Sequence, residues 1–348
     1  MGYVAIKGGE EAIENSLEFY EDSCLNDDLR EQDIESSLRF AIDKVMAEGS
    51  LYSKKLASIA IKKSAGDLLN AAFFLRAHRS TANRMGEVKA IDINQMKLVR
   101  RISSAFKDIA GGQILGASND YEVKLLSSKI HKQQKWQTFS KAGNIIESAI
   151  EPLRKQGFVK TIEPDKEVSD ITRIFPKSPY PRSAMMQMMS RGESGSMLGF
   201  SYTSIRGYGD VHPTIGDLRL GSCDVSFTHP LTGNEVKVGE IEVTACESAG
   251  IFEKQSDNRV QLTTGFGFCF GFNETKAISM SIIDLSLYNS KYSIGEREIA
   301  GDFEMMMHHI DGVDSMGFTN HFKLPHYVTF QSDLQVFLNA NTFLKGKQ

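Results

Sequence analysis

Four of the eight histidines in this chain lie in one stretch near its C-terminal end, residues 308–326. Asp311 and Asp314 stand between the two histidine pairs of this stretch. Imidazole nitrogens are common ligands of zinc, and imidazoles and carboxylates are the side chains that most often move protons in active sites. This stretch is therefore where we first expect chemistry.

The second histidine pair, His321 and His326, flanks a Leu-Pro joint. Pro325 suits the first turn of a helix, where its missing N–H would have no partner. The two imidazoles can then converge on a divalent metal such as zinc, in a site open to water, to substrate or to a ligand from another chain. The alternative is a pair of ordinary hydrogen-bonded histidines at a helix end. Spacing alone favours this alternative, because His-x4-His is not a recognised ligand spacing.

The elements that must position these residues follow from the apolar pattern. Apolar residues recur at helical spacing after Pro325 and predict an amphipathic C-terminal helix. The same spacing predicts a helical bundle in the N-terminal third, over residues 10–20, 34–47, 56–63 and 68–79. Asp67 is placed to cap the last of these helices. A fifth helix is expected over Met96–Ile109, with a solvated basic face as its first interpretation and contact with polyphosphate or an acidic partner as the alternative.

The C-terminal half has the pattern of an antiparallel sheet with helices. Apolar residues alternate between Thr214 and Ala245, with glycines between the runs. The segment Gly265–Phe272 alternates glycine with aromatic residues or cysteine, as expected of a strand pressed against neighbouring backbone. Asn273 can cap a helix over Glu274–Tyr288. The fold class is therefore α+β, with a mainly helical N-terminal domain (1–150), an extended connection (151–192) and an α+β domain carrying the histidines (193–348).

Composition narrows the functional classes. The chain has 348 residues, 41% of them hydrophobic, and a net charge of -4, which does not suggest a nucleic-acid binder. Lysines around Trp136 suggest a strip for single-stranded nucleic acid, but an exposed helix or a docking surface is the better interpretation. No apolar run is long enough for a membrane span, and the N-terminal residues show no signal-peptide pattern, so we expect a cytoplasmic protein. The four cysteines stand apart, which argues against a thiolate zinc finger or an iron–sulfur cluster.

Several unusual strings stand together in this chain, at residues 3–10, 45–52, 101–108, 111–116, 207–213, 276–280, 317–318 and 321–327. Together they resemble the PhnI family, the I subunit of the bacterial carbon–phosphorus lyase core complex. The resemblance covers nearly the whole chain and is poorest over residues 117–191. Two departures are Ala117-Ser118, where the family has Pro-Thr, and Ala245, where it has glutamate.

The resemblance implies a reaction and a set of partners. A PhnI protein helps replace the adenine of ATP with methylphosphonate, giving ribose 1-methylphosphonate 5-triphosphate, and acts as a nucleosidase when alone. The implied partners are the G, H and J subunits of the core and the L subunit, in an assembly with two copies of this chain. By the same resemblance, His321 and His326 match a family pair that binds zinc at the interface with J, which reverses the preference drawn from spacing alone.

The implied reaction passes through an oxocarbenium-like transition state, as glycoside cleavage does. It needs negative charge near the sugar, a proton donor for adenine, and cationic or N–H groups for the triphosphate. For each candidate, a structural ion pair, a surface charge or a turn cap is the competing interpretation. A scaffold subunit that only binds partners and contributes metal ligands is the alternative function. The candidates are Asp311, Asp314, Glu48 and Asp284 as carboxylates, His212 and His309 as proton donors, and Arg206, Lys276 and Lys323 as phosphate ligands.

Overall fold

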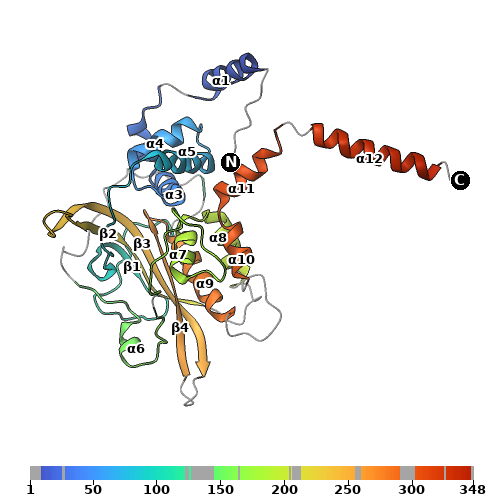
Figure 1. The fold of residues 1–348 in the computed structure, drawn as a ribbon. Helices are drawn as coiled ribbons and strands as arrows, with labels where there is room; N and C mark the ends of the chain where they lie inside the picture. The colour runs from blue at the N-terminus through green and yellow to red at the C-terminus, as the bar shows by residue number, and fades with distance from the viewer. Residues whose placement is uncertain are drawn as a thin grey trace.

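The computed structural model describes residues 9–25, 28–121, 125–126, 145–163, 165–203, 205, 213–254, 260–290, 302–324 and 327–345. It combines a four-stranded antiparallel sheet with helices at one end and along one face (Figure 1). The lysine-rich segment around Trp136 lies outside these ranges.

The N-terminal helices pack into the predicted bundle. They are α1 (Glu10–Cys24), α2 (Glu31–Ser37), α3 (Arg39–Gly49), α4 (Lys54–Lys63) and α5 (Leu68–Thr81). Apolar side chains of α2 to α5 form one buried core, whereas α1 buries none of its residues. The single helix expected over 34–47 is two helices, because the backbone leaves helical geometry at Leu38. Asp67 caps α5 as predicted, since its carboxylate accepts hydrogen bonds from the N–H groups of Leu69 and Asn70 at 3.0 and 3.2 Å.

The sheet joins the two halves of the chain. Its order is β1 (Lys97–Ile102), β2 (Thr214–Thr228), β3 (Glu235–Lys254) and β4 (Val260–Phe270), with every neighbouring pair antiparallel. The expected strands over 214–245 and 265–272 are confirmed as β2, β3 and β4. Because β1 comes from the N-terminal third, the predicted N-terminal and C-terminal domains share this sheet.

The prediction of a helix over Met96–Ile109 was wrong. Residues 97–102 form strand β1, and Arg100 and Arg101 are fully buried instead of lining a solvated face. Arg101 and Arg219 share the carboxylate of Asp217, with Nη2–Oδ2 distances of 3.0 and 2.8 Å. A periodicity argument misses such a strand, because it counts an arginine as exposed.

Helix α9 (Glu274–Ser290) lies along β3 and β4 on the side that carries the glycines of β4. A Cβ atom at Gly267 would come within 2.1 Å of the carbonyl oxygen of Ala277, so the helix can approach only because this strand lacks side chains there. A methionine-rich core joins α9 to α7 (Arg182–Arg191), α8 (Ser194–Thr203) and α10 (Phe303–His309). Helices α6 (Glu151–Lys155) and α7 lie within the segment expected to be an extended connection.

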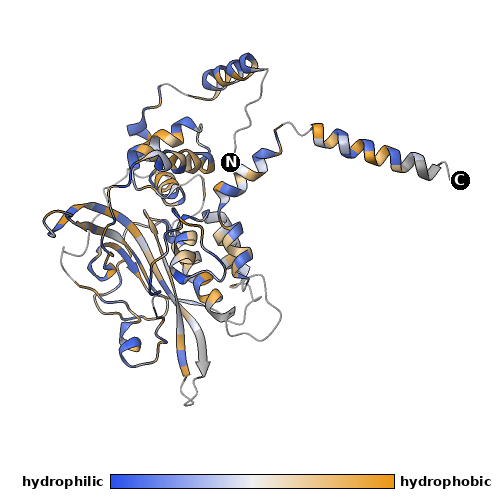
Figure 2. Ribbon diagram, in the orientation of Figure 1, coloured by the Kyte–Doolittle hydropathy of each residue, from blue (hydrophilic) through white to orange (hydrophobic). Residues whose placement is uncertain are grey.

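The last two helices leave the body of the molecule. Helix α11 (Gly312–His321) is followed by α12 (Tyr327–Lys345), which projects away from the sheet and the other helices (Figure 1). The predicted C-terminal helix is thus confirmed. Hydrophobic residues are distributed along α12 although it stands apart (Figure 2), and Val328, Phe330 and Phe337 are each more than half exposed. No helix in the described part of the chain is long and apolar enough to cross a membrane.

Candidate active site

The first histidine pair belongs to helix α10. His308 is exposed, but its Nε2 lies 3.1 Å from the hydroxyl of Tyr180 and its ring stacks on Phe175. His309 is also exposed, and its Nδ1 lies 2.7 Å from the carbonyl oxygen of Met305 in the preceding turn. Both histidines therefore lie at the surface, and His308 is held there by two aromatic side chains.

Asp311 holds helix α11 against the bundle. Its carboxylate caps α11 by accepting the N–H of Asp314 at 3.2 Å, and both of its oxygens lie 2.8 Å from Nη1 of Arg76 in α5. Arg76 also donates from Nη2 to the carbonyl oxygen of Glu48 at 2.8 Å. Asp314 is largely exposed, with its Oδ1 3.9 Å from the same guanidinium. Asp311 therefore has structural partners, which were the competing interpretation in the sequence.

The structure places only part of the expected metal site. His321 is the last residue of α11 and is exposed, with its ring 6.3 Å from that of Phe322. His326 lies outside the described residues, as do His212 and Arg206, and the exposed Lys323 follows α11 directly. The described ranges contain no group of three or more histidine, cysteine or acidic side chains that could hold a metal ion. Zinc at His321 therefore fits only an open site completed by ligands from elsewhere.

Two other candidates, Glu48 and Lys276, meet in the interior between α3 and α9. Both are almost completely buried. The Oε1 atom of Glu48 accepts hydrogen bonds from the N–H and hydroxyl of Ser194, at 3.0 and 2.7 Å. Lys276 donates from Nζ to the carbonyl oxygen of Gly192 at 2.7 Å. Burial lowers the pKa of Lys276, and the negative charge of Glu48 opposes this shift.

A second ion pair flanks the first. Lys44, one turn before Glu48 on α3, lies with its Nζ 3.8 Å from Oε1 of Glu48 and 3.0 Å from Oε1 of Glu193. Burial alone would raise the pKa of Glu193. Hydrogen bonds from the N–H groups of Gly195 and Ser196, together with Lys44, outweigh burial and lower that pKa to about 2. The result is a compact cluster of two lysines and two glutamates.

A pocket of about 320 Å³ opens beside this cluster, at the N-terminal end of α9. We call it the α9 pocket. Three of its lining residues lie in or next to the sequence strings that resemble the PhnI family. Lys44 directly precedes string 45–52, Ala117 directly follows string 111–116, and Lys276 is the first residue of string 276–280. The lining residues are Phe40, Lys44, Ala117, Ser118, Asn119, Asp120, Ser194, Leu220, Phe272, Asn273, Glu274, Thr275 and Lys276.

Glu274 is a carboxyl group of this pocket whose pKa is raised, which is the direction that suits a proton donor. Burial raises its pKa, and the nearby Arg100, whose Nε is 2.6 Å from Oε1, only partly offsets this. The same Arg100 pairs with Asp120 through Nη2 at 2.5 Å. A carboxyl group with a raised pKa is better suited to act as a general acid near neutral pH. The α9 pocket thus combines a proton donor, buried cationic groups and hydroxyls.

Sequence reasoning identified Lys276 and Glu48 but missed Glu274, Lys44 and Ser194. Glu274 directly follows the predicted helix cap Asn273, so its place at a helix start was available from the sequence. Asp284, another candidate carboxylate, has structural partners. Its Oδ2 lies 2.7 Å from Nη2 of Arg182 and accepts the N–H of Phe266 at 2.8 Å.

Comparison with known proteins gives a consistent match. The family model described as "Bacterial phosphonate metabolism protein (PhnI)" matches residues 2–342. A putative C-P lyase subunit protein, HtxH, from Stutzerimonas stutzeri is 41% identical over 353 residues, covering 96% of this chain and 94% of the relative. The alpha-D-ribose 1-methylphosphonate 5-triphosphate synthase subunit PhnI of Escherichia coli (strain K12) is 37% identical over 344 residues, covering 96% and 97%. The protein of the same name from Rhizobium meliloti is 35% identical over 343 residues, covering 96% and 93%.

Proposed function

This chain belongs to the PhnI family of bacterial phosphonate metabolism proteins, and we propose that within a carbon–phosphorus lyase complex it replaces the adenine of ATP with methylphosphonate at ribose C1. The observation that carries the proposal is the family match over residues 2–342. Two curated relatives that the chain covers almost completely bear the name of a ribose 1-methylphosphonate 5-triphosphate synthase subunit.

We place the chemistry in the α9 pocket. As the bond from ribose C1 to adenine breaks, positive charge develops on the sugar and negative charge on the base. The protonated carboxyl of Glu274 donates a proton to the departing adenine, and a phosphonate oxygen then forms the new bond to C1. Lys44 and Lys276 bind oxygens of the triphosphate. Glu48 acts as a positioning residue, because its charge favours the ammonium form of Lys276.

The test measures adenine release from ATP and methylphosphonate by the chain purified with its partner subunits. Glu274→Gln removes the proton donor and should lower kcat about 100-fold or more with little change in KM. Lys276→Gln should raise KM for ATP. Glu87→Gln is the matched control, because Glu87 is exposed and pairs only with Arg84 among the described residues. Full activity in a correctly folded Glu274→Gln variant would place the chemistry elsewhere.

The untested candidates enter the same assay. Asp311, Asp314 and His309 lie together at α10 and α11, and Lys323 follows them in the chain, so a substrate could be bound there by residues of a second subunit. Loss of adenine release in His309→Ala with the fold intact would favour this location over the α9 pocket. His212 remains a candidate proton donor and Arg206 a candidate phosphate ligand, and the variants His212→Ala and Arg206→Ala test these roles in the same assay.

A scaffold function is the second candidate, and the exposed end of the chain favours it. Phe318, Phe322, Val328 and Phe330 are all more than 60% exposed on α11 and α12 and in the turn that ends α11. Apolar surface of this kind is typical of contact with other proteins. The partners we propose are the G, H, J and L subunits, with two copies of this chain per assembly. A folded complex that forms fully but releases no adenine would favour the scaffold.

Zinc is a proposal of its own. His321 supplies one exposed imidazole at the end of α11, and we propose that His326 and a partner subunit complete the site. Bound zinc would act as a Lewis acid on a substrate oxygen. Metal analysis of the purified complex should show zinc in the wild type and a loss in the His321→Ala/His326→Ala double variant. Equal zinc contents in the two proteins would show that these two histidines do not bind the metal.

A further inference from the structure

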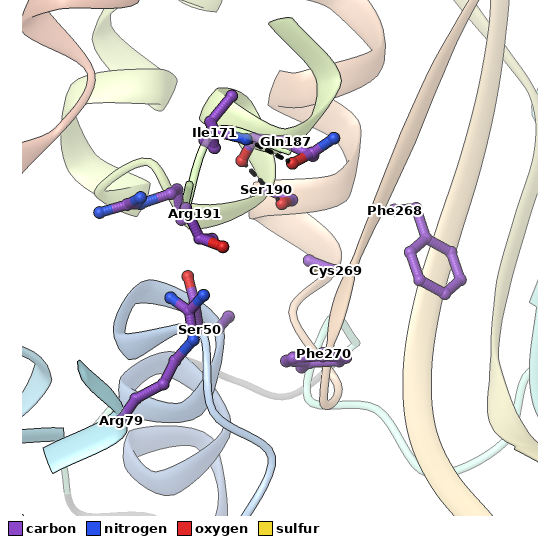
Figure 3. Close-up of a pocket in the computed structure, with 11 residues that line it drawn as sticks. Ser50, Arg79, Ile171, Gln187, Ser190, Arg191, Phe268, Cys269 and Phe270 are labelled. Atoms are coloured by element: carbon purple, nitrogen blue, oxygen red, sulfur yellow. Dashed lines mark hydrogen bonds between the residues drawn. The ribbon is translucent and has the colours of Figure 1, made fainter. Parts of the chain in front are cut away.

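A second pocket, of about 230 Å³, lies where α3, α5, α7 and β4 come together (Figure 3). We call it the Arg79 pocket. It shares no lining residue with the α9 pocket, although residues of α3 border both. Its lining residues are Ala47, Ser50, Arg79, Ile171, Thr172, Gln187, Ser190, Arg191, Phe268, Cys269 and Phe270.

The cation of this pocket is Arg79. Its guanidinium reaches past Ser50 toward the space below Ser190 and Gln187, whereas that of Arg191 points away (Figure 3). Burial lowers the pKa of Arg79, and the positive charges of Arg76 and Arg84 lower it further. Among the described residues, Asp170 is the carboxylate that opposes this shift, and it already accepts hydrogen bonds from Thr172 and Arg84. The side chain of Arg79 forms no ion pair or hydrogen bond with the described part of the chain.

The surroundings of Arg79 are also positive. Arg191 has its Nη2 3.7 Å from Oδ2 of Asp311, which is the same carboxylate that Arg76 binds. Arg76 and Arg191 thus share the partly buried carboxylate of Asp311, while Asp314 is largely exposed and no ion pair among the described residues joins a carboxylate to Arg79. The burial of unbalanced positive charge is unfavourable unless an anion joins it. This region is therefore prepared for a ligand with negative charge.

The other polar side chains of the pocket offer little to a ligand. Gln187 uses both ends of its amide, accepting the N–H of Ile171 at 3.2 Å and donating to the carbonyl oxygen of Ser169. Ser190 donates its hydroxyl to the carbonyl oxygen of Gln187 at 2.9 Å. Arg79 and the hydroxyl of Ser50 remain as donors for an incoming group. Two donors at one side of a pocket suit the oxygens of an oxyanion.

The remaining wall is apolar. Ala47, Ile171 and Phe270 contribute hydrocarbon surface, and Cys269 is buried between α3 and α9. Burial raises the pKa of the Cys269 thiol to about 12, so this side chain is neutral and acts as a small apolar group. A ligand that fits must therefore be charged at one end and apolar at the other. A free inorganic oxyanion would leave this wall unused.

We propose that the Arg79 pocket binds a small alkylphosphonate, with its oxygens on Arg79 and Ser50 and its alkyl group against Ala47 and Cys269. The volume of about 230 Å³ suits a small alkylphosphonate such as methylphosphonate or ethylphosphonate. This inference rests on the proposed function for the identity of the ligand. It adds a selection site separate from the α9 pocket, so a bound phosphonate must move from the Arg79 pocket to the α9 pocket before its oxygen bonds to ribose C1. The alkylphosphonate is then recognised by its charge and by its apolar group together.

Calorimetric titration of the full chain with methylphosphonate, in the absence of ATP, tests the site directly. Arg79→Gln should weaken binding about 10- to 100-fold, as expected for the loss of charged hydrogen bonds. Arg79→Lys keeps the charge but loses the paired N–H groups, so its affinity should lie between those of the wild type and Arg79→Gln. Arg30→Gln removes an exposed arginine that pairs with Asp33 and should leave the affinity unchanged.

Two outcomes would overturn the site. One is an unchanged affinity in a folded Arg79→Gln variant, with folding checked by circular dichroism, or in Arg79→Lys if the first variant unfolds. The other is inorganic phosphate binding as tightly as methylphosphonate, since the apolar wall would then contribute nothing. The titration is independent of turnover. Binding that depends on Arg79 without adenine release would reject the proposed function and keep the site. Adenine release by the wild type, together with an unchanged methylphosphonate affinity in Arg79→Gln, would keep the proposed function and reject the site.

Discussion

At the scale of single residues, several buried charges of this chain are matched within hydrogen-bonding distance. Asp217 accepts from Arg101, from Arg219 and from the N–H of Ala149. Both arginines also donate to the carbonyl oxygen of Glu147. The cluster therefore fixes residues 147–149 onto the sheet. A buried ion pair of this kind adds little net stability when complete but is costly to break.

Asp217→Asn should lower the free energy of unfolding by about 3 to 5 kcal/mol, because it leaves two buried guanidinium groups without a counter-charge. Denaturant titration at neutral pH measures this. Asp224→Asn is the control, since Asp224 pairs with Lys97 and Lys237 at the surface and should cost at most about 1 kcal/mol. Similar losses in the two variants would show that burial does not decide the effect.

Acid should weaken the fold through Glu193. The pKa of Glu193 is about 2 in the folded chain, against an ordinary value of 4.5, so its contribution is complete above pH 4.5 and is lost as the pH falls toward 2. The contribution amounts to about 2 to 3 kcal/mol. The free energy of unfolding should therefore fall less steeply with acidification in Glu193→Gln than in the wild type. Parallel slopes for the two proteins would contradict this assignment.

Substitution of Asp311 distinguishes a structural role of this residue from a catalytic one. Asp311→Asn removes the charge that binds Arg76, so helix α11 should detach more often and the chain should become about 1 to 2 kcal/mol less stable. Proteolysis near residue 311 should accelerate. Asp314→Asn, at an exposed position in the same helix, should change neither quantity. If Asp311→Asn abolishes adenine release while stability and proteolysis stay unchanged, Asp311 acts in the chemistry.

At the scale of elements, the fit between α9 and the sheet depends on missing side chains. Gly267→Ala would place a methyl group 2.1 Å from the carbonyl oxygen of Ala277, so the helix or the strand must shift. We expect a loss of about 1 to 3 kcal/mol or more, measured by thermal unfolding. Gly239→Ala on β3 meets nothing within 4 Å and should change stability by at most about 0.5 kcal/mol. Equal losses of stability in the two variants would contradict the close approach of α9 to β4.

The elements also show what the sequence could and could not predict. Helical spacing and the caps Asp67 and Asn273 predicted most of the helices, and the alternation of apolar residues predicted strands of the C-terminal half. These signals are local in the sequence. The pattern failed at β1, where Arg100 and Arg101 are buried through partners such as Asp120 and Asp217 that lie far along the chain. The α9 pocket could not be predicted from the sequence for the same reason. Glu48 and Lys276 were recognisable as candidates, but nothing local indicated that the charge of Glu48 acts on Lys276.

At the scale of the whole molecule, the uncovered helix α12 gives the clearest expectation for assembly. Phe330→Asp and Phe337→Asp should leave the stability of the isolated chain unchanged, because both residues are exposed in it. Each substitution should weaken co-purification of the partner subunits by about tenfold or more if α12 docks on them. Thr329→Asp, which adds the same charge next to Phe330, is the control. Normal co-purification of both phenylalanine variants would show that α12 does not dock.

The pairing of β1 with β2 has a consequence for how the protein is made. Lys97 is opposite Ser222 in the sheet, so a ribosome must finish more than half of the polypeptide before the two strands can meet. Until then the nascent chain exposes an unpaired strand edge on which Arg101 lacks its partner Asp217 and Arg100 lacks its partner Glu274, and such edges promote aggregation. Expression of the first 150 residues alone should accordingly yield insoluble material, and slow translation should lengthen the dependence on chaperones.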